Sequence, residues 1–530
     1  MKKAVMFLVI LTVLASIATL VEAQAPNPGS GTSYGAVQNV DSTGAANFRQ
    51  EFYDQDGNLD AYREKTNVAY GDTMGLTTNQ TTDAPLNTEL PMGWVGSSVV
   101  ASDREAAAVV LINYIGGSIG PDGLTSADYS GVLTPGSDNF CPSVGKRNEE
   151  DTTIVVMNTS DQQVTDVEIS FKDRNGADVG TPMTGITIPA KAQKTFNLFN
   201  PAFNLPDRFL GAARVRSPGG TPLAVVAVTH WGPGSTAFGS FAYNCQSSDA
   251  GATVLYAPKV MRRNPNGNPT GQWLDSTGII VVNTEGTAAT ARVEFYDRDG
   301  NFGGVFTDTI PAFSARGYNT EYVGNADPNV INGLIGTGTT AAPRWLGSAV
   351  VKSVTGQRLV GVVKQAYEID KWAGGYNMLS DANAGTTWFF PLVYRRGFNR
   401  PWTDYVGLIC QNVSATPVTP QVQFVDRRAT ATKCTASTTT CQFTDSTAMA
   451  QYVSHGYNTR YGGNQSATWF GDPNTGATGN TLGNNFIGAA YVTAGADIVC
   501  IQETWMEEMQ DLANTWHTGG DANLNNVYGK

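Results

Sequence analysis

The sequence contains four copies of one repeated unit, and this repetition constrains the fold more than any other feature. A short apolar run that ends in Asn marks each copy, and the four marker residues are Asn39, Asn158, Asn283 and Asn412. The markers are 119, 125 and 129 residues apart. An Asp follows each marker after 14 or 15 residues, at Asp54, Asp173, Asp297 and Asp426. This period is too long for the blades of a β-propeller, which need about 40–50 residues.

Between these landmarks, short runs of Val, Ile, Thr, Tyr and Phe are separated by Gly, Asn and Asp, and no apolar stripe has helical spacing. A unit of about 110–140 residues holds about seven strands, the size of an antiparallel β-sandwich. The pattern therefore predicts an all-β protein of four tandem immunoglobulin-like β-sandwich domains after a signal peptide. The expected domains are residues 24–136, 137–250, 251–386 and 387–530.

Three of the four units open with an aromatic residue, a Pro two positions later and a basic pair, at Phe140–Arg147, Tyr256–Arg263 and Phe389–Arg396. The Pro is typical of an edge strand, where a missing N–H costs no ladder bond. Nothing before Gly35 matches this motif, so the first unit is expected to lack its opening strand and to expose a sheet edge. Such an edge invites a strand from another chain. Residues 24–33 and the tail after Trp505 are the segments we consider for bridging subunits in a filament.

The order of these motifs along each unit resembles that of the tandem immunoglobulin-like or fibronectin-III-like repeats of secreted bacterial surface proteins. The resemblance covers nearly all of the chain after the N-terminal segment. It implies a non-catalytic role in an extracellular structure, an adhesin or a cell envelope, and it carries over no set of binding residues.

The N-terminus has the three-part layout of a secretory signal peptide. A cationic start, Met1–Lys3, precedes an uncharged apolar run from Ala4 to Leu20, and Val21–Ala23 supplies the cleavage site. A transmembrane anchor is the competing interpretation, but the run is short for one. We expect removal of residues 1–23, no membrane span in the remaining chain, and a secreted protein that is extracellular or attached to the cell surface.

An exported chain keeps its cysteines as disulfides rather than as metal ligands or redox thiols. The six cysteines allow several connectivities, and their placement narrows the choice. Cys434 and Cys441 flank one Thr-rich loop. Cys410 and Cys500 both end apolar strand-like runs within one repeat, and Cys141 and Cys245 lie at the two ends of another. The predicted bonds are Cys141–Cys245, Cys410–Cys500 and Cys434–Cys441.

The chain has 34 basic and 46 acidic side chains, a formal net charge of −12, and it has no block of Lys and Arg. This balance disfavours nucleic acid and anionic membranes as partners. We expect the partners to be other copies of the chain, other cell-surface components, or glycans.

Two turns resemble the start of a calcium loop and give the weak metal candidates Asp54, Asp56, Asp297, Asp299 and Asp308. The EF-hand pattern fails beyond these residues, because its Gly and its closing Glu are absent from the required positions. Asp-Gly also supplies the positive φ of a β-hairpin turn, which is the interpretation we favour. No cofactor is expected.

The sequence predicts no catalytic residues. Gly116–Gly120 fits the nucleophile-elbow expression, but Pro121 follows where a helix is required. The three histidines, His230, His455 and His517, lie at unrelated places in the repeats, so their spacing indicates no catalytic triad. We therefore expect no enzymatic activity.

Aromatic residues support the alternative function, a polysaccharide-binding protein with exposed Trp or Tyr platforms. Four aromatics are assigned to equivalent positions that plug the sandwich ends, namely Tyr114, Trp231, Tyr367 and Trp505, whereas Trp273, Trp372, Trp388, Trp402 and Trp516 are scattered. A third alternative is the accessory domain array of a hydrolase. The basic pairs Arg262–Arg263 and Arg395–Arg396 are expected on a solvated edge. The leading hypothesis is a secreted, non-enzymatic structural or adhesive protein of four stiff units placed end to end.

Overall fold

The protein is built almost entirely of β-strands, so the all-β prediction is confirmed. The computed structural model describes residues 29–77, 84–119, 123–232, 239–263, 275–320, 344–367, 372–396, 404–427, 442–445, 447–459, 486–510 and 516–530. The predicted signal peptide, Cys434, Cys441, Trp273 and Trp402 lie outside this part of the chain. In the described part of the chain, three short 3₁₀ helices accompany the strands, η2 (Pro201–Phe203), η3 (Ser248–Ala250) and η4 (Asp381–Asn383).

The strands fall into four groups that follow the sequence repeats, and we call each group a unit. The first unit contains β1 (Gly29–Asn39), β2 (Ala46–Tyr53), β3 (Leu59–Val68), β4 (Thr73–Thr77), β5 (Ser97–Ser102), β6 (Ala106–Gly116) and β7 (Leu124–Ser130). The second contains β8 (Asp138–Arg147), β9 (Glu150–Asn158), β10 (Val164–Asp173), β11 (Asp178–Ile188), β12 (Gln193–Asn197), β13 (Phe209–Arg216), β14 (Leu223–Trp231), β15 (Gly239–Asn244) and β16 (Gln246–Ser247).

The last two units repeat the second. The third contains β17 (Val254–Arg263), β18 (Asp275–Asn283), β19 (Ala289–Asp297), β20 (Phe302–Ile310), β21 (Ala315–Asn319), β22 (Arg344–Ser353), β23 (Leu359–Tyr367), β24 (Trp372–Asn377) and β25 (Leu379–Ser380). The fourth contains β26 (Gly385–Arg396), β27 (Asp404–Asn412), β28 (Gln421–Asp426), β29 (Gln442–Thr444), β30 (Ser454–Asn458), β31 (Phe486–Gln510), β32 (Trp516–Asn526) and β33 (Tyr528–Gly529). β26 begins two residues before the boundary expected from the sequence.

Each unit has an inner and an outer layer of antiparallel strands. The inner layer has the order β4-β1-β6-β7 in the first unit, and β12-β9-β14-β15 and β21-β18-β23-β24 in the next two. The outer layer has the order β11-β10-β13-β8 in the second unit and β20-β19-β22-β17 in the third. We call β8, β17 and β26 the opening strands, since each begins its unit and pairs with the late strand β13, β22 or β31.

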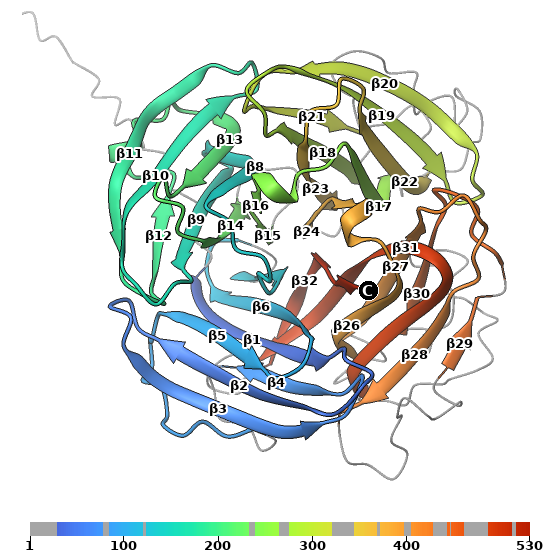
Figure 1. Cartoon of the computed structure of the whole chain (residues 1–530), viewed down its shortest axis with the longest axis horizontal. Coiled ribbons are helices and arrows are strands. Elements are labelled where there is room, and N and C mark those ends of the chain that lie inside the picture. Colours follow the sequence, from blue (N-terminus) through green and yellow to red (C-terminus); the bar gives the residue numbers. More distant parts are fainter. Residues whose placement is uncertain are drawn as a thin grey trace, which may run out of the picture.

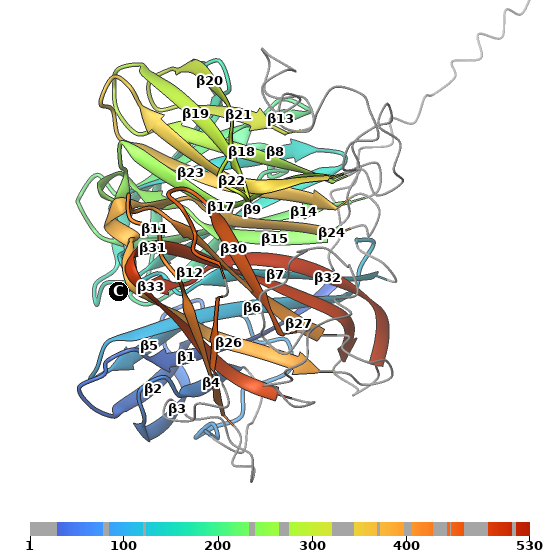
Figure 2. The ribbon, with the colours of Figure 1, turned by 90° about the vertical axis from the view of Figure 1, so that its right-hand side faces the viewer.

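The four units form a closed ring rather than the end-to-end string expected from the sequence (Figure 1). The strands β7, β15, β24 and β32 meet around the centre, where each contacts the corresponding strand of both neighbouring units. Figure 2 shows these strands stacked through the middle of the molecule. One buried apolar cluster contains Ala36, Ile279 and Ile409 and so spans three units. The expected linear arrangement was wrong because the outward sides of the inner layers are themselves apolar and are buried between units.

The opening strands lie at the joints of this ring. Each packs on the inner layer of the following unit: β8 contacts β18 and β23, β17 contacts β27 and β31, and β26 contacts β1 and β6. This placement buries the basic residues Arg262 and Arg395, which are 6% and 2% exposed, so the predicted solvated edge was wrong for both. Burial lowers the pKa of Arg395 to about 10.

In every unit, the side chain of the repeated Asn is buried and forms hydrogen bonds with backbone groups of a turn. All four marker side chains are fully buried. In the third unit, Asn283 Nδ2 donates to the carbonyl oxygens of Thr287 at 2.6 Å and Ile310 at 3.3 Å, while its Oδ1 accepts the Glu285 N–H at 3.0 Å. The other three markers make the same type of contact. The marker therefore recurs because it satisfies backbone groups that water cannot reach.

Replacing Asn283 by Ala is expected to lower the free energy of unfolding by about 2–3 kcal/mol, since buried carbonyl groups lose their donors. Urea denaturation measures this change. The exposed Gln451 provides the control, because Gln451→Ala removes a similar amide at the surface. If both variants lose the same small amount of free energy of unfolding, the role assigned to the Asn283 hydrogen bonds is contradicted.

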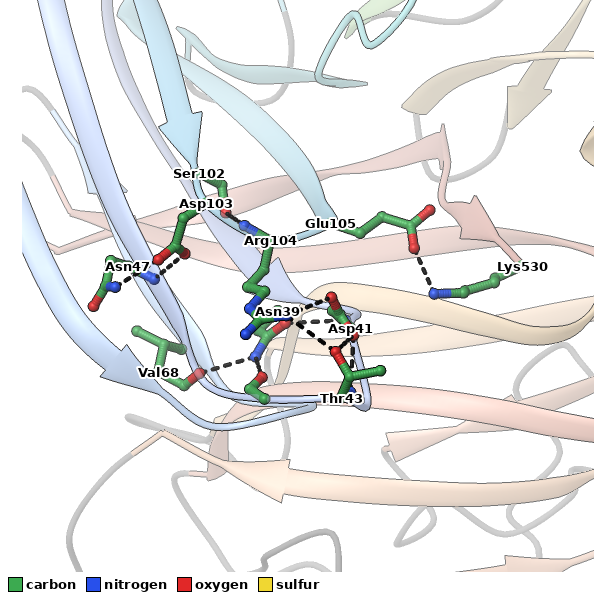
Figure 3. A network of polar contacts seen from close by, with 11 residues as sticks. Asn39, Asp41, Thr43, Asn47, Val68, Ser102, Asp103, Arg104, Glu105 and Lys530 are labelled. Atoms are coloured by element: carbon green, nitrogen blue, oxygen red, sulfur yellow. Dashed lines mark hydrogen bonds and ion pairs between the residues drawn. The ribbon is translucent and has the colours of Figure 1, made fainter.

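The C-terminal tail closes the ring within the chain. β32 pairs with β31 and β33 pairs with β26, so the tail does not extend away to bridge subunits as considered above. Glu105 of the first unit accepts hydrogen bonds from Tyr528 Oη and Lys530 Nζ. Figure 3 shows the contact between Glu105 and Lys530 beside a polar network that joins Arg104 to Asp41 and Thr43. Residues 29–33 are likewise used within the chain, in the pairing of β1 with β6.

Two disulfides lie in the described part of the chain, and each joins two cysteines of a single unit. Cys141 is bonded to Cys245 and Cys410 to Cys500, as their placement in the sequence predicted. Cys141 lies in an opening strand, whereas Cys410 and Cys500 lie opposite each other on β27 and β31. The bonds therefore hold different pairs of strands in the two units.

Candidate functional site

Among the residues that the structure describes, no opening strand lies at the joint between the first and second units. Among the described residues, β5 pairs with β2 alone and forms the edge of the order β3-β2-β5. Its counterparts β13, β22 and β31 each pair with an opening strand on that side. The missing strand that the sequence predicted for the first unit is thus absent from the described structure, and one edge is unpaired.

The side chains of β5 that face into the sandwich are uncovered at this edge. Ser98 and Ser102 are exposed and Val100 is half-buried. In the second unit, the residues at the positions of Ser98 and Val100 are Ala213 and Val215, which are 1% and 0% exposed. The difference arises because β8 covers these residues in the second unit.

The facing side of the second unit is uncovered in the same way. Val155 and Met157 on β9 are half-buried, although they point away from the core of their own sandwich. The corresponding pairs in the other units are completely or almost completely buried against the preceding unit: Ala36 and Gln38, Ile280 and Val282, and Ile409 and Gln411. We call the β5 edge together with Ser98, Val100, Ser102, Val155 and Met157 the open strand position.

Hydrogen bonds connect the first and second units on either side of the open strand position, as they do in another joint. Ser97 Oγ donates to the carbonyl oxygen of Lys191 in the second unit, and Ser348 Oγ makes the same contact with Tyr452 between the third and fourth units. Near the centre, Asn244 Nδ2 donates to the Ser130 carbonyl at 3.0 Å. The two units are therefore held at both ends of the position while its middle stays uncovered.

A buried polar group lies next to this position. Gln50 is 5% exposed and donates through Nε2 to Ser98 Oγ at 2.9 Å, but its Oε1 has no hydrogen-bond partner among the described residues. The second and third units have Ile169 and Val293 at this place on the outer layer. A buried acceptor without a partner is costly, so the core of the first unit is incompletely satisfied.

The predicted metal candidates lie in β-hairpin turns. Asp54 Oδ1 accepts the N–H groups of Asp56 and Asn58 at 2.9 and 2.8 Å, and Asp297 makes the same bonds with Asp299 and Asn301. Asp308 is placed beside Arg316, with 3.6 Å between its Oδ2 and the Arg316 Nε. The carboxylates that the EF-hand comparison grouped together are thus engaged in separate contacts. In the described part of the chain, no group of three or more His, Cys, Asp or Glu side chains is arranged to hold a metal ion.

Millimolar calcium is expected to change the melting temperature by less than about 1 °C, because a ligand that does not bind the folded state cannot stabilise it. Differential scanning calorimetry with and without calcium measures this. A rise in melting temperature that the Asp299→Asn variant abolishes would instead establish a calcium site in the third unit.

The two histidines whose side chains are described, His230 and His455, are buried. His230 Nδ1 lies 2.7 Å from Ser240 Oγ, and its ring stands edge-on to Tyr114 of the first unit. His230 is 5% exposed and Ser240 is fully buried. Burial lowers the pKa of His230 to about 4. His455 Nδ1 lies 2.7 Å from Asp445 Oδ2 in the fourth unit, and the side chain of His517 is outside the described part.

Asp151, opposite His230 on β9, predicts a pH dependence of stability. Burial raises its pKa to about 6, although Asn197 Nδ2 donates to Oδ2 at 2.6 Å. Because the folded-state pKa exceeds the unfolded value, this carboxyl stabilises the protein below about pH 4, and the contribution is lost as pH rises through 6. Asp151→Asn is therefore expected to gain about 2–3 kcal/mol relative to the parent between pH 4 and 7.

Urea titrations of both proteins at several pH values measure this difference. Asp207→Asn is the control, because the Asp207 side chain is 97% exposed. A difference between parent and Asp151→Asn that stays constant from pH 4 to 7 would contradict the burial effect.

The aromatic positions fill the joints of the ring. Strand register gives Tyr114, Trp231, Tyr367 and Met506 as equivalents, so the assignment of Trp505 was wrong by one residue. Trp505 is 7% exposed, stacks on Tyr405 and meets Trp372 of the third unit edge-on at 4.5 Å between ring centroids. Every Trp and Tyr whose burial is described is buried or half-buried. The described aromatics therefore act in packing.

A cavity of about 140 Å³ lies on the other side of the first unit, at its joint with the fourth. Tyr34, Leu76, Leu392, Tyr394, Arg427 and Ile487 line it. This joint contains the opening strand β26, so the cavity is a packing space within an occupied joint.

Sequence reasoning located the unpaired edge but missed Val155 and Met157. Neither residue carries a motif, and both have the apolar character expected of any strand. Their exposure follows from the ring arrangement. Because neighbouring units are in contact, a joint without an opening strand leaves side chains of the following unit uncovered as well as those of its own unit.

Comparisons with known proteins do not assign the chain to a family. No protein-family model matches it, and no curated protein matches it. A solved structure titled "Crystal Structure of Thermotoga maritima 1070" aligns at 10% identity over 28% of this chain and 97% of that chain, with a TM-score of 0.18, which is too low to carry an argument. Among the described residues, no helix is long and apolar enough to cross a membrane.

Proposed function

We propose that the protein is a secreted, non-enzymatic structural or adhesive protein of the bacterial cell surface or extracellular matrix, built from immunoglobulin-like sandwiches. The observation that carries this proposal is the edge of β5, which pairs only with β2 in the described part of the chain, whereas each of the other joints contains an opening strand. An unpaired edge is a template for association with another chain. The two disulfides support an oxidising compartment.

Fractionation of the source cells tests this role. The protein is expected in the culture fluid or in a surface wash, starting near Gln24, with Cys141–Cys245 and Cys410–Cys500 intact by mass spectrometry after alkylation. Recovery from the cytoplasm with these four cysteines alkylated as free thiols would contradict the proposal.

The polysaccharide-binding alternative receives no support from a specific contact, because the described Trp and Tyr side chains are used in packing. We therefore propose protein partners, other copies or other surface components, ahead of glycans. A glycan array probed with the purified protein is expected to give no signal above background.

A further inference from the structure

We infer that the open strand position binds an extended segment of another polypeptide, antiparallel to β5, that carries an aromatic–aromatic–Pro–aliphatic sequence. This inference rests on the proposed role as an association scaffold and names the partner chemistry. It is argued from the three opening strands of the same chain, which occupy the corresponding position in the other joints.

The edge dictates an extended, antiparallel occupant with a bulge. All three opening strands pair antiparallel with the counterpart of β5, and in each the register shifts where the Pro and the next residue oppose a single residue. That residue is Ala212, Ser348 or Ala489, and its counterpart in the first unit is Ser97. Pro is suited to a bulge because it has no N–H to donate to the ladder.

The residues before the Pro alternate between two apolar environments. On the side facing its own unit, the opening strand presents residues such as Trp388 and Phe390, which are fully buried. On the other side, Phe140, Tyr256 and Phe389 meet an aromatic ring of the following unit. At the open strand position, Val100 and Met157 are the half-buried apolar groups that face these two directions. In the second unit, Lys191 stands at the place of Phe313 and Tyr452, so an aromatic residue on that side would pack on Met157 and Lys191. Consecutive aromatic residues would thus cover Val100 on one side and Met157 on the other.

The type of the residue after the Pro matches the side chain that it meets in the following unit. Lys259 follows the Pro of β17 and forms a buried ion pair with Glu503. Leu392 follows the Pro of β26, and Leu111 stands at the position of Glu503 and shares a buried cluster with Leu392. In the second unit, this position is Val228. An apolar residue after the Pro therefore fits the open strand position, and β26 is its best template.

The chain itself is a poor source of this segment. Within the described structure, all three opening strands are paired in their own units. Residues 24–28, Gln-Ala-Pro-Asn-Pro, contain no aromatic and no large aliphatic side chain. The occupant that we propose is accordingly a segment of a different polypeptide.

The test uses a fluorescent peptide with the sequence of residues 385–396, GTTWFFPLVYRR, added to the full mature protein. Fluorescence anisotropy is expected to show saturable binding. A peptide of the same composition with Pro391 and Tyr394 exchanged, and one with Lys in place of Leu392, are expected to bind at least about tenfold more weakly, because each loses the bulge or buries an unpaired charge.

Two protein variants locate the site. Val100→Asp on β5 and Met157→Asp on β9 are each expected to weaken binding at least about tenfold, whereas Ala101→Asp, on the exposed opposite face of β5, keeps the parent affinity. Circular dichroism verifies that each variant is folded, and Met157→Asp decides the outcome if Val100→Asp unfolds. Hydrogen exchange is expected to show new protection at residues 97–102.

Equal binding of the control peptides, unchanged binding by folded Met157→Asp, or protection outside β5 would overturn the inference. Exposure of β26 on adding the peptide would show that the peptide replaces the chain's own strand, which also contradicts it. Self-association of the protein through β5 without peptide would show that a second copy is the occupant. These results are independent of where the cell places the protein, so fractionation can refute the proposed function while peptide binding stands.

Discussion

Replacing Glu150 by Ala is expected to lower the free energy of unfolding by about 3–5 kcal/mol, because a charge is left buried without its partner. Glu150 is 1% exposed and lies 3.0 Å from Lys364 Nζ of the third unit, and Arg147 Nη2 donates to its other oxygen. Burial alone would raise the pKa of Glu150, but Lys364 and Arg147 together lower it to about 2. The pair therefore stays ionised and joins two units.

The neighbouring Glu149 gives a matched control. Its side chain is 18% exposed and pairs with Arg208 at 3.0 Å, so Glu149→Ala is expected to cost less than about 1 kcal/mol. The double variant Glu150→Leu/Lys364→Met removes both charges and is expected to recover most of the stability lost by Glu150→Ala. Urea denaturation measures all three. A loss in Glu150→Ala no larger than in Glu149→Ala would show that this joint does not form.

Removing the Cys141–Cys245 bond is expected to cost about 2–5 kcal/mol, because it closes a long loop in the unfolded chain. The two cysteines are 104 residues apart. The third unit supplies a natural replacement, since strand register and backbone bonding place Ala257 and Met378 at the positions of Cys141 and Cys245. The variant Cys141→Ala/Cys245→Met therefore removes the cross-link while keeping apolar side chains that this fold accepts.

Guanidinium denaturation of the variant and of the parent, with and without a reducing agent, measures this effect. Reduction is expected to destabilise the parent more than the variant, since the parent loses both described bonds and the variant retains only Cys410–Cys500. Equal stability of variant and parent under oxidising conditions would contradict the contribution assigned to this bond.

The local structure followed from the sequence because each motif has a local physical cause. Asn283 and its three counterparts recur because a turn buries backbone groups that only a side-chain amide satisfies. Asp54 and Asp297 recur because hairpin turns need an acceptor for consecutive N–H groups. Such requirements repeat with the units and are visible without coordinates.

The ring was not predictable because its contacts join residues that have no motif in common. Lys259 and Glu503 are 244 residues apart, and Lys364 and Glu150 are 214 residues apart. Each ion pair occurs in one joint, and different residues stand at the equivalent positions of the other joints. The repeated motifs therefore do not reveal these pairs. The misplacement of Trp505 has a related cause, since a shift of one residue along a strand moves a side chain to the opposite face.

Small-angle X-ray scattering of the purified protein tests ring closure, on which the joints and the open strand position depend. A compact chain of this length has a radius of gyration of about 23–24 Å. A string of four sandwiches, each about 35–40 Å long from its strand lengths, would give about 40 Å or more. We expect the compact value and a single symmetric peak in the pair-distance distribution. A value near that of the string, with a long tail in the distribution, would contradict the closed ring.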